Sequence, residues 1–166
     1  SPEGTMYATS VSPLAAPSEG RMWVVNLGNG AVTQLTPDDG LAYDDSSPVW
    51  SPDGQWVSFQ RLDFSQAPNY RINAYRVRPD GTEFTSLTPG DEFIDAITYA
   101  PDGRLVLISR NGIELFDLTT MQRTVILPLS AFPSTVRPNG EGIGWSRTLN
   151  TIVWPMFNKS LNRYDM

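Results

Sequence analysis

The chain has 166 residues, with 12 basic and 18 acidic side chains, a formal net charge of −6, no histidine and no cysteine. These counts exclude a Ser-His-Asp or Cys-His nucleophile, a histidine zinc site and any disulfide within the chain, because each needs an absent residue type. The negative charge argues against nucleic acid and anionic membrane surfaces as partners, since both select for clustered lysine and arginine. No apolar run approaches the length of a transmembrane helix.

A four-residue turn begins the chain and recurs along it. Residues 1–4 (Ser-Pro-Glu-Gly) match residues 51–54 (Ser-Pro-Asp-Gly), and residues 100–103 (Ala-Pro-Asp-Gly) repeat the pattern. In such a turn proline fixes φ, aspartate accepts hydrogen bonds from nearby amides, and glycine takes the left-handed conformation that closes a hairpin. The pattern therefore predicts positive φ at Gly54 and Gly103, and local amide hydrogen bonds to Asp53 and Asp102.

Short apolar and β-branched segments around these turns predict strands, and no segment has sustained helical spacing. Four strands in a meander, called A to D here, are predicted for each complete unit. The hairpins of strands C and D are predicted, in chain order, at residues 22–27 and 32–35, 72–77 and 84–87, and 113–118 and 124–127. The A and B strands flank the turns at 51–54 and 100–103.

Aromatic residues mark the same place in successive units. Trp50, Tyr99 and Trp145 are separated by 49 and then 46 residues. A period just under fifty, built from short strands, is typical of β-propeller blades. We therefore expect the three side chains to occupy equivalent buried positions on three successive A strands.

The predicted fold is all-β, with roughly three and a half four-stranded blades of a larger propeller. It comprises a partial blade at 1–37, complete blades at 46–89 and 95–129, and a partial blade at 141–166, where residues 161–166 match a C strand. Propellers close with four to eight blades, and an open one leaves strand edges unpaired. This favours remaining blades from the same longer chain, with assembly from a second copy as the alternative.

Residues 34–59 carry a family resemblance. A Leu-Thr end to strand D leads through a polar loop into Ser-Pro-Val-Trp-Ser-Pro-Asp-Gly, which resembles the repeat of TolB-type propellers. Residues 86–103 repeat the pattern with Tyr99 in the tryptophan place, whereas the fourth unit keeps Trp145-Ser146 and loses Pro-Asp-Gly. Such repeats occur in periplasmic TolB proteins, in propeller domains of prolyl-oligopeptidase-like enzymes and in extracytoplasmic surface proteins. The resemblance implies a bacterial, periplasmic or cell-surface location.

Nothing in the sequence assembles into a catalytic constellation, a cofactor site or a metal site. Gly144-Trp145-Ser146 half resembles a nucleophile elbow, but the last glycine is missing and Ser146 aligns with Ser51 of the turn repeat. The acidic loops lack the alternation of an EF-hand. Neither catalysis nor a cofactor is therefore expected within this chain.

The loops between strands D and A are acidic. In a propeller meander they emerge on one face, around the channel mouth, together with the B-to-C loops. A solubilising surface is one reading, and an acidic mouth for a cationic peptide or a divalent ion is the other. The seven carboxylates are Asp38, Asp39, Asp44, Asp45, Asp91, Glu92 and Asp95.

Two of the B-to-C loops, residues 10–20 and 62–69, are long, and long loops on a rigid fold often determine specificity. Phe64, Tyr70 and Arg71 are residue types enriched as interface anchors, although Phe64 has the alternative of packing on its own blade. The predicted partner-binding residues are Asp44, Asp45, Asp91, Glu92, Asp95, Phe64, Tyr70 and Arg71.

Two functions follow as hypotheses. The first is a non-catalytic, TolB-like propeller module that binds a protein or peptide, with a cationic partner fitting best, on the face of the D-to-A and B-to-C loops. The second is the substrate-gating propeller of a prolyl-oligopeptidase-like serine hydrolase whose catalytic domain lies outside this chain. A propeller glycosidase with paired carboxylates is a weaker third hypothesis.

Overall fold

Short antiparallel strands make up nearly all of the regular structure. The computed structural model describes residues 1–15, 19–39, 42–65, 68, 70–90, 93–133, 136–138, 143–146, 151–153, 156–158 and 163–165. The chain forms two compact units, Ser1–Glu92 and Phe93–Met166. Among the described residues, no helix is long and apolar enough to span a membrane.

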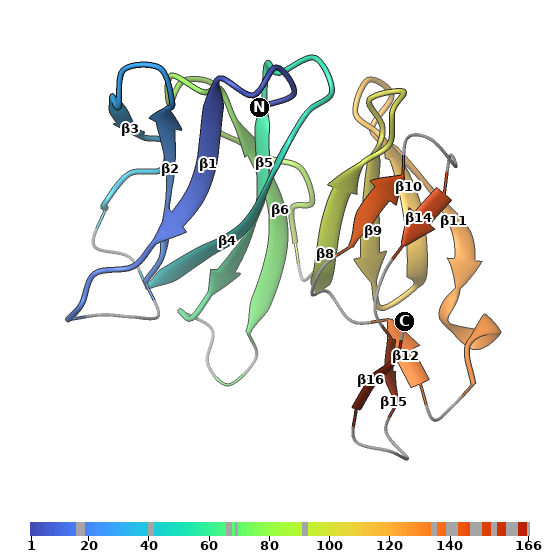
Figure 1. Cartoon of the computed structure of the whole chain (residues 1–166). Helices are drawn as coiled ribbons and strands as arrows, with labels where there is room; N and C mark the ends of the chain where they lie inside the picture. The colour runs from blue at the N-terminus through green and yellow to red at the C-terminus, as the bar shows by residue number, and fades with distance from the viewer. Residues whose placement is uncertain are drawn as a thin grey trace. The chain divides into compact units, whose positions relative to one another are not determined.

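The first unit contains two antiparallel meanders (Figure 1). The first is a three-stranded sheet of β1 (Met6–Val11), β2 (Arg21–Asn26) and β3 (Val32–Gln34). The second is a four-stranded sheet of β4 (Tyr43–Trp50), β5 (Val57–Asp63), β6 (Arg71–Val77) and β7 (Thr85–Ser86). In both sheets, strands that follow one another in the sequence also pair with one another. This confirms the predicted strands B to D of the first sheet and A to D of the second.

The turn between β4 and β5 has the predicted backbone conformation and hydrogen bonds. Gly54 has a φ of 70°, and its amide donates to the Ser51 carbonyl over 2.9 Å. Asp53 Oδ1 accepts from the Gln55 amide at 3.0 Å and from Ser51 Oγ at 2.5 Å. The equivalent turn of the second unit agrees, since Gly103 has a φ of 88° and Asp102 Oδ1 accepts from the Arg104 amide at 3.1 Å.

The two hairpins that carry this turn differ by one residue in the position of the hydrogen bond that closes them. The Ser51 amide bonds the Trp56 carbonyl, whereas the Ala100 amide bonds the Arg104 carbonyl. Across the hairpins Trp50 consequently pairs with Val57, and Tyr99 pairs with Leu105. The two units therefore match residue for residue along strand A and through the turn. On strand B, the residue that pairs with the last residue of strand A differs by one position between the two units.

The core of the first unit lies between its two sheets. Buried apolar side chains of β1 and β2 meet those of β5 and β6. The cluster consists of Ala8, Met22, Val24, Leu35, Val57, Phe59 and Val77, with Met6, Trp50 and Tyr75 packed against it. Close packing of two sheets in this way is the expected source of stability for a unit whose described regular structure consists of strands.

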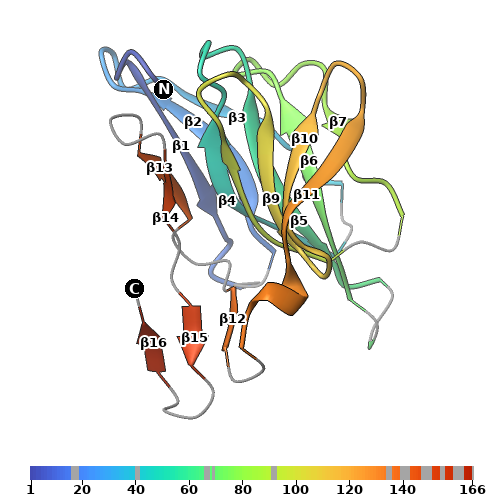
Figure 2. The same ribbon diagram turned by 90° about the vertical axis from the view of Figure 1, so that its right-hand side faces the viewer.

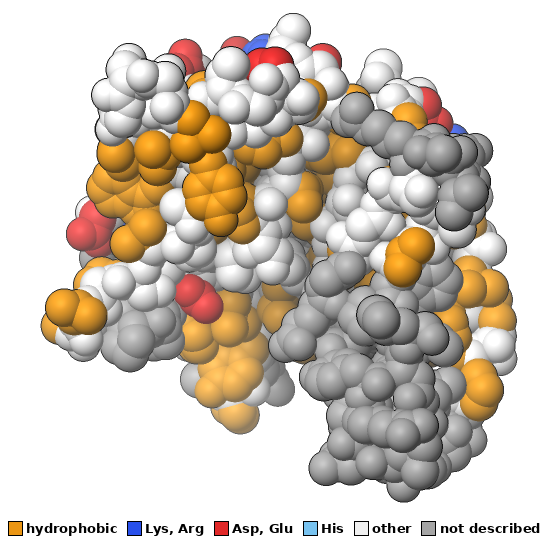
Figure 3. Space-filling view, viewed as in Figure 1, with side chains coloured by type: hydrophobic (Ala, Val, Ile, Leu, Met, Phe, Trp, Pro, Cys, Tyr) orange, Lys and Arg blue, Asp and Glu red, His pale blue; other side chains and the backbone are white. Residues whose placement is uncertain are grey.

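The opposite face of the first sheet is apolar and exposed. Tyr7 is 58% exposed, and Val11 and Val32 are also exposed, and Figure 3 shows hydrophobic side chains gathered over this sheet. The turn repeat aligns Tyr7 with Val57, which is fully buried against the first sheet. The exposed face of the first sheet thus corresponds, in the repeat, to the face of the second sheet that is buried against the first.

The second unit opens with a four-stranded sheet. Its strands are β8 (Ile94–Tyr99), β9 (Leu105–Ser109), β10 (Gly112–Asp117) and β11 (Gln122–Pro128), followed by the short 3-10 helix η1 (Leu129–Ala131). Gly112 has a φ of 117°, and a Cβ there would lie 2.1 Å from the Leu127 carbonyl oxygen. Only glycine therefore fits where the chain turns from β9 into β10 against β11.

The rest of the second unit departs from the predicted partial blade at 141–166. β13 (Gly144–Ser146) and β14 (Thr151–Val153) pair as strands A and B. However, β16 (Arg163–Asp165) pairs with β15 (Met156–Asn158), which pairs with β12 (Val136–Pro138), and these strands lie apart from the hairpin (Figure 2). The assignment of residues 161–166 to strand C beside strand B was wrong. The change coincides with loss of the Pro-Asp-Gly turn and with Pro155, which has no amide hydrogen to donate to a ladder.

The marker aromatics all lie on A strands, as predicted: Trp50 on β4, Tyr99 on β8 and Trp145 on β13. Tyr99 is buried, whereas Trp50 and Trp145 are half-buried, each packed on the hydrophobic cluster of its own unit. Both indole Nε1 atoms are buried without a hydrogen-bond partner among the described residues. The predicted location of the three side chains on A strands is confirmed. The predicted burial is confirmed for Tyr99 and is partial for Trp50 and Trp145.

Candidate functional site

Strand pairing brings two loops of the second sheet to one edge. Tyr43, at the start of β4, pairs with Asp63 at the end of β5, and Asp63 pairs with Arg71 at the start of β6. The Phe64 amide also donates to the Ala42 carbonyl at 3.0 Å. The D-to-A and B-to-C connections of this sheet therefore lie together. We call this region the loop edge, comprising Gly20, Asp44, Phe64, Tyr70 and Arg71.

The long loop of the first sheet is tied to this edge. Asp44 Oδ1 accepts a hydrogen bond from the Gly20 amide at 2.8 Å, and the Asp45 amide donates to the Gly20 carbonyl at 2.9 Å. At the other end of the loop, Ser10 Oγ donates to the Asp45 carbonyl at 2.5 Å. Gly20 is required here, because a Cβ would lie 2.6 Å from Asp44 Oδ1 and 2.8 Å from the Asp45 carbonyl oxygen. Both ends of the loop are thereby fixed by β4.

Arg21 reinforces the loop edge from inside. Its buried guanidinium donates through Nη1 to the carbonyls of Tyr43 at 2.8 Å and Gly20 at 3.1 Å, and through Nε to the carbonyl of Pro37 at 3.1 Å. Asp38 lies 3.8 Å away. Arg21 was missed at the sequence level, although an arginine opening a strand beside acidic loops was an available signal.

Asp45 is not part of an acidic surface, and this corrects the sequence prediction. The residue is 0% exposed, and its carboxylate is paired with Arg61, from Nε to Oδ1 at 2.6 Å and from Nη2 to Oδ2 at 2.8 Å. Side chains alternate between faces along a strand, so neighbouring aspartates on β4 point in opposite directions. Asp44 is left at the loop edge, and Asp45 neutralises a buried arginine.

An aromatic cage surrounds the Arg61 guanidinium. Its central carbon lies 4.6 Å from the centroid of the Tyr43 ring, 5.3 Å from Tyr75 and 4.9 Å from Phe84. Cation–π contacts of this kind contribute most when the cation is desolvated. The guanidinium is therefore in contact with three rings in addition to the Asp45 carboxylate.

Asp44 has an unusual electrostatic environment for a surface carboxylate. Burial raises the pKa of its carboxyl group, the Gly20 amide hydrogen bond opposes that change, and the neighbouring Asp45 adds to it. The carboxylate is thus held as a structural hydrogen-bond acceptor for the loop of the first sheet. Its contribution to an outward negative field is correspondingly reduced.

The predicted aromatic anchors are brought together. The rings of Phe64 and Tyr70 meet edge to face, with centroids 5.7 Å apart and an interplanar angle of 79°. Tyr70 is 47% exposed, and Phe64 and Arg71 are half-buried. Phe64 therefore packs within its own loop and at the same time supports the exposed Tyr70 ring.

The acidic residues predicted for the second unit are described incompletely. Asp95 is half-buried on β8, at the irregularity between Ile94 and Ala96. Asp91 and Glu92 lie outside the described residues. Among the residues that are described, no group of three or more aspartate or glutamate side chains is arranged to hold a metal ion.

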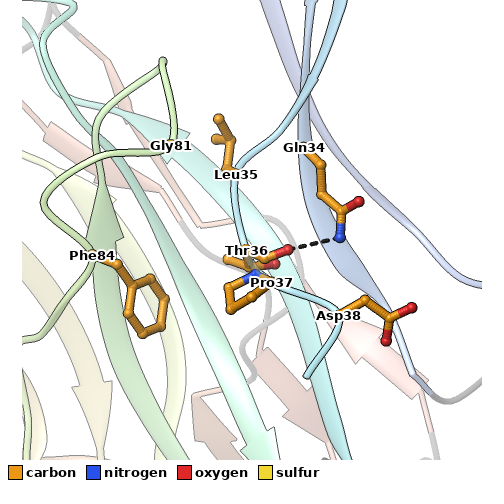
Figure 4. A pocket seen from close by; sticks show the side chains of 7 residues that line it. All are labelled: Gln34, Leu35, Thr36, Pro37, Asp38, Gly81 and Phe84. Carbon is orange, nitrogen blue, oxygen red and sulfur yellow. Dashed lines mark hydrogen bonds between the residues drawn. The ribbon is translucent and has the colours of Figure 1, made fainter. Parts of the chain in front are cut away.

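The first unit also contains an open groove of about 520 Å³ (Figure 4). One wall is the end of β3 with the residues after it, and the other is the connection between β6 and β7. The lining residues are Gln34, Leu35, Thr36, Pro37, Asp38, Gly81 and Phe84. Gln34 Nε2 donates to the Thr36 carbonyl at 2.8 Å, which holds that side chain along the groove.

Solved structures share this arrangement of sheets. TolB from Acinetobacter baumannii is 20% identical with a TM-score of 0.56, over 99% of this chain and 40% of that one. A puromycin-hydrolyzing peptidase from Mycobacterium tuberculosis is 18% identical with a TM-score of 0.61, over 99% of this chain and 27% of that one. The beta-propeller domain of the Trilobed protease from Pyrococcus furiosus is 12% identical with a TM-score of 0.58, over 98% and 53%.

These comparisons establish the fold class. The chain has the β-propeller fold, as a part of a propeller, and structures of TolB proteins and of peptidases share it. The chain spans between 27% and 53% of the length of these three proteins. No family model and no curated protein sequence matches it.

Proposed function

We propose that this chain is a non-catalytic, TolB-like propeller module that binds a protein or peptide partner at its loop edge, in an extracytoplasmic compartment. The observation that carries the proposal is the exposed Tyr70 ring, supported by Phe64 and placed beside a loop fixed by Asp44. Aromatic side chains on rigid supports lose little entropy on binding, and they are enriched among residues that dominate binding energy.

The likeness to TolB and to peptidase propellers is compatible with a binding role, because it concerns the scaffold and not its sites. The exposed carboxylate of Asp38, in the connection that leads from β3 to β4, favours a cationic or neutral partner. Asp44 is half-buried, and Asp45 adds no field because Arg61 neutralises it. Such charges mainly raise association rates and exclude anionic partners.

The test is selection of binding peptides from a random phage-displayed library on the immobilised chain. A selected peptide, fluorescently labelled, is then titrated with the variants Tyr70→Ala and Tyr7→Ala. Tyr70→Ala should weaken binding at least tenfold, as loss of an anchor does. Tyr7→Ala is the matched control, since Tyr7 is similarly exposed but lies on the first sheet. Equal losses for both variants, or a loss for Tyr7→Ala alone, would refute the loop edge as the site.

The second candidate function is the propeller part of a serine peptidase whose catalytic domain lies outside this chain. It is supported by the similarity to peptidase propellers. The neighbouring coding sequence decides between the two, because a peptidase needs a nucleophile elbow followed by aspartate and histidine. Absence of these residues from the complete gene product would remove this candidate.

We also propose that a further blade covers the exposed face of the first sheet, supplied by the same longer polypeptide or by a second copy. Tyr7 on that face is the counterpart of Val57, which an adjacent sheet buries. The mass of the 166-residue chain in solution tests this. A stable, non-aggregating monomer would contradict the proposal, because its apolar face would then remain in water.

A further inference from the structure

We infer that the groove between the end of β3 and the β6–β7 connection binds a lysine or arginine side chain of an extended peptide. The inference goes beyond the loop edge, because it concerns a separate pocket of the first unit and names the chemistry of its occupant. It rests on the shape of the groove, on the fixed position of its aromatic wall and on the sign of its exposed charge.

The groove depends on the close approach of two segments. Gly81, with a φ of 85°, lies against the end of β3, where a Cβ would be 3.4 Å from the Gln34 carbonyl oxygen. The segment therefore packs against the end of β3, and Gly81 and Phe84 form the facing wall. Leu35, buried in the core of the unit, anchors the other wall.

The aromatic wall is held in place from behind. Phe84 stacks on Tyr75, with ring centroids 5.2 Å apart and an interplanar angle of 20°, and the Arg61 guanidinium lies 4.9 Å from its ring centroid. Even so, Phe84 is 39% exposed. The Phe84 and Pro37 side chains both line the groove (Figure 4). Together they offer an apolar surface to the methylene stem of a long side chain.

The charged side chain that lines the groove, Asp38, is negative. The Asp38 side chain is 80% exposed, and its 3.8 Å contact with Arg21 is longer than a hydrogen bond. On the other segment Asp80 precedes Gly81 and is exposed, and the exposed Glu83 is paired with Arg78 at 3.3 Å. The two nearby buried arginines add little outward field, because Arg61 is paired with Asp45 and Arg21 donates to three carbonyls.

An apolar wall with a carboxylate at its end selects an amphipathic cation. The stem of lysine or arginine fits against Phe84 and Pro37, and the charged head fits near Asp38, where a charge-assisted hydrogen bond can form. A negatively charged side chain in the groove would instead be repelled by Asp38. An extended peptide places such a side chain in the groove while its backbone runs along the surface.

The experiment uses the ¹⁵N-labelled 166-residue chain and two small probes. N-acetyl-arginine methylamide supplies the cation, and N-acetyl-citrulline methylamide has nearly the same shape without the charge. We expect saturable amide shifts in residues 34–36, Asp38 and residues 81–84 with the arginine probe, and about threefold weaker binding of the citrulline probe, the size of one exposed charge contact. Equal affinities, or shifts confined to other residues, would overturn the inference.

Two variants with a matched control sharpen the result. Asp38→Asn should abolish the preference for arginine over citrulline, and Phe84→Leu should weaken both probes together by removing the flat wall. Glu3→Gln is the control, because Glu3 is an exposed carboxylate at the first turn, beside Gly54. An Asp38→Asn chain that keeps the full preference, with an unchanged folded spectrum, would contradict the site.

The groove and the loop edge can fail independently. Tyr70→Ala should leave binding of the arginine probe unchanged, because Tyr70 does not line the groove. A negative peptide selection with a positive arginine titration would refute the loop edge and keep the groove. The reverse outcome would refute the groove and keep the proposed function.

Discussion

The two complete sheets share a backbone plan and differ in what they bury. In the β4–β7 sheet, strand β5 carries the buried polar residues Ser58, Gln60 and Arg61, and β4 supplies Asp45 as the counter-ion. In the β8–β11 sheet, strand β9 buries an apolar run from Leu105 to Ile108. Its buried charge is instead Glu114 on β10, which accepts from Arg123 Nε on β11 at 2.8 Å.

The difference shows which part of the repeat is fixed. Both sheets keep the turn glycine, the neighbouring aspartate and the aromatic end of strand A, which determine the backbone. The interior chemistry varies, provided that each buried charge has a partner within its own sheet. A repeat of this kind therefore specifies architecture strongly and leaves side-chain function free to change.

The largest effect is expected from breaking the buried ion pair of the β4–β7 sheet. Asp45→Ala leaves the Arg61 guanidinium buried without a counter-ion, which should lower the free energy of unfolding by about 3–5 kcal/mol. The double variant Asp45→Ala/Arg61→Met should recover much of this loss, because no unpaired charge remains. Urea unfolding followed by tryptophan fluorescence measures both.

Asp38→Ala serves as the control for that pair, because its carboxylate is exposed and should contribute less than about 0.5 kcal/mol. Similar losses for Asp45→Ala and Asp38→Ala would mean that Asp45 is not buried with Arg61. The contrast between the interiors of the two sheets would then disappear.

The tryptophans of the A strands come next. Trp50→Ala should lower the free energy of unfolding by about 3 kcal/mol, the low end for aromatic core truncation, because the side chain is half-buried. Trp50→Phe should lower the free energy of unfolding by only about 1 kcal/mol. The loss of apolar contacts is smaller than in Trp50→Ala, and removal of a buried N–H without a partner partly offsets it. The measurement is again chemical denaturation, read by circular dichroism.

Trp145→Ala extends the tryptophan test to the second unit. A loss close to that of Trp50→Ala would show that the two positions are equivalent in energy as well as in sequence. A negligible loss would restrict the equivalence to backbone geometry.

The turn glycines should behave alike in both sheets. Gly54→Ala and Gly103→Ala each place a Cβ at positive φ, which should cost about 1–2 kcal/mol. A Cβ at Gly103 meets no atom within 4 Å, and one at Gly54 lies 3.2 Å from the flexible end of the Glu3 side chain and 3.6 Å from Pro2 Cδ, an ordinary contact. Thermal unfolding should therefore give equal losses, and unequal ones would show that the turns differ in strain.

The smallest effect concerns pH and the aspartates of the same turns. The Ser51 hydroxyl and the Gln55 amide lower the pKa of Asp53, and Arg104 lowers that of Asp102 through its side chain and its amide. A carboxyl group whose pKa is depressed by folding stabilises the protein above its unfolded pKa of about 3.8, and this contribution is lost as the pH falls through the folded value.

Stability measured from about pH 6 down to about pH 2.5 should accordingly fall less steeply in Asp53→Asn and Asp102→Asn than in the unaltered chain. Both groups are largely exposed, so the difference should be small. A steeper fall in either variant would contradict the sign of the depressed pKa.

The sequence predicted the fold well because its signals are local. The Pro-Asp-Gly turns, the glycine conformations and the order of strands follow from residues close together in the chain. The predictions that were corrected depended on pairing between distant residues. Asp44 and Asp45 look alike in sequence, and strand alternation separates them. Arg61 inside a predicted strand was the available signal that one aspartate faces inward. Residues 161–166 have strand propensity, but propensity does not select a partner strand.

The attachment of both ends of the first long loop to β4 has a consequence for how this protein can change. Ser10 and Gly20 are held by Asp44 and Asp45, so the ends of the loop stay in place whatever lies between them. The entropic cost of closing a loop grows slowly, by about 0.6 kcal/mol for each doubling of its length. Segments inserted between Val11 and Glu19 would therefore add new surface at little thermodynamic cost, which makes this loop a natural position for evolving or engineering new recognition sequences.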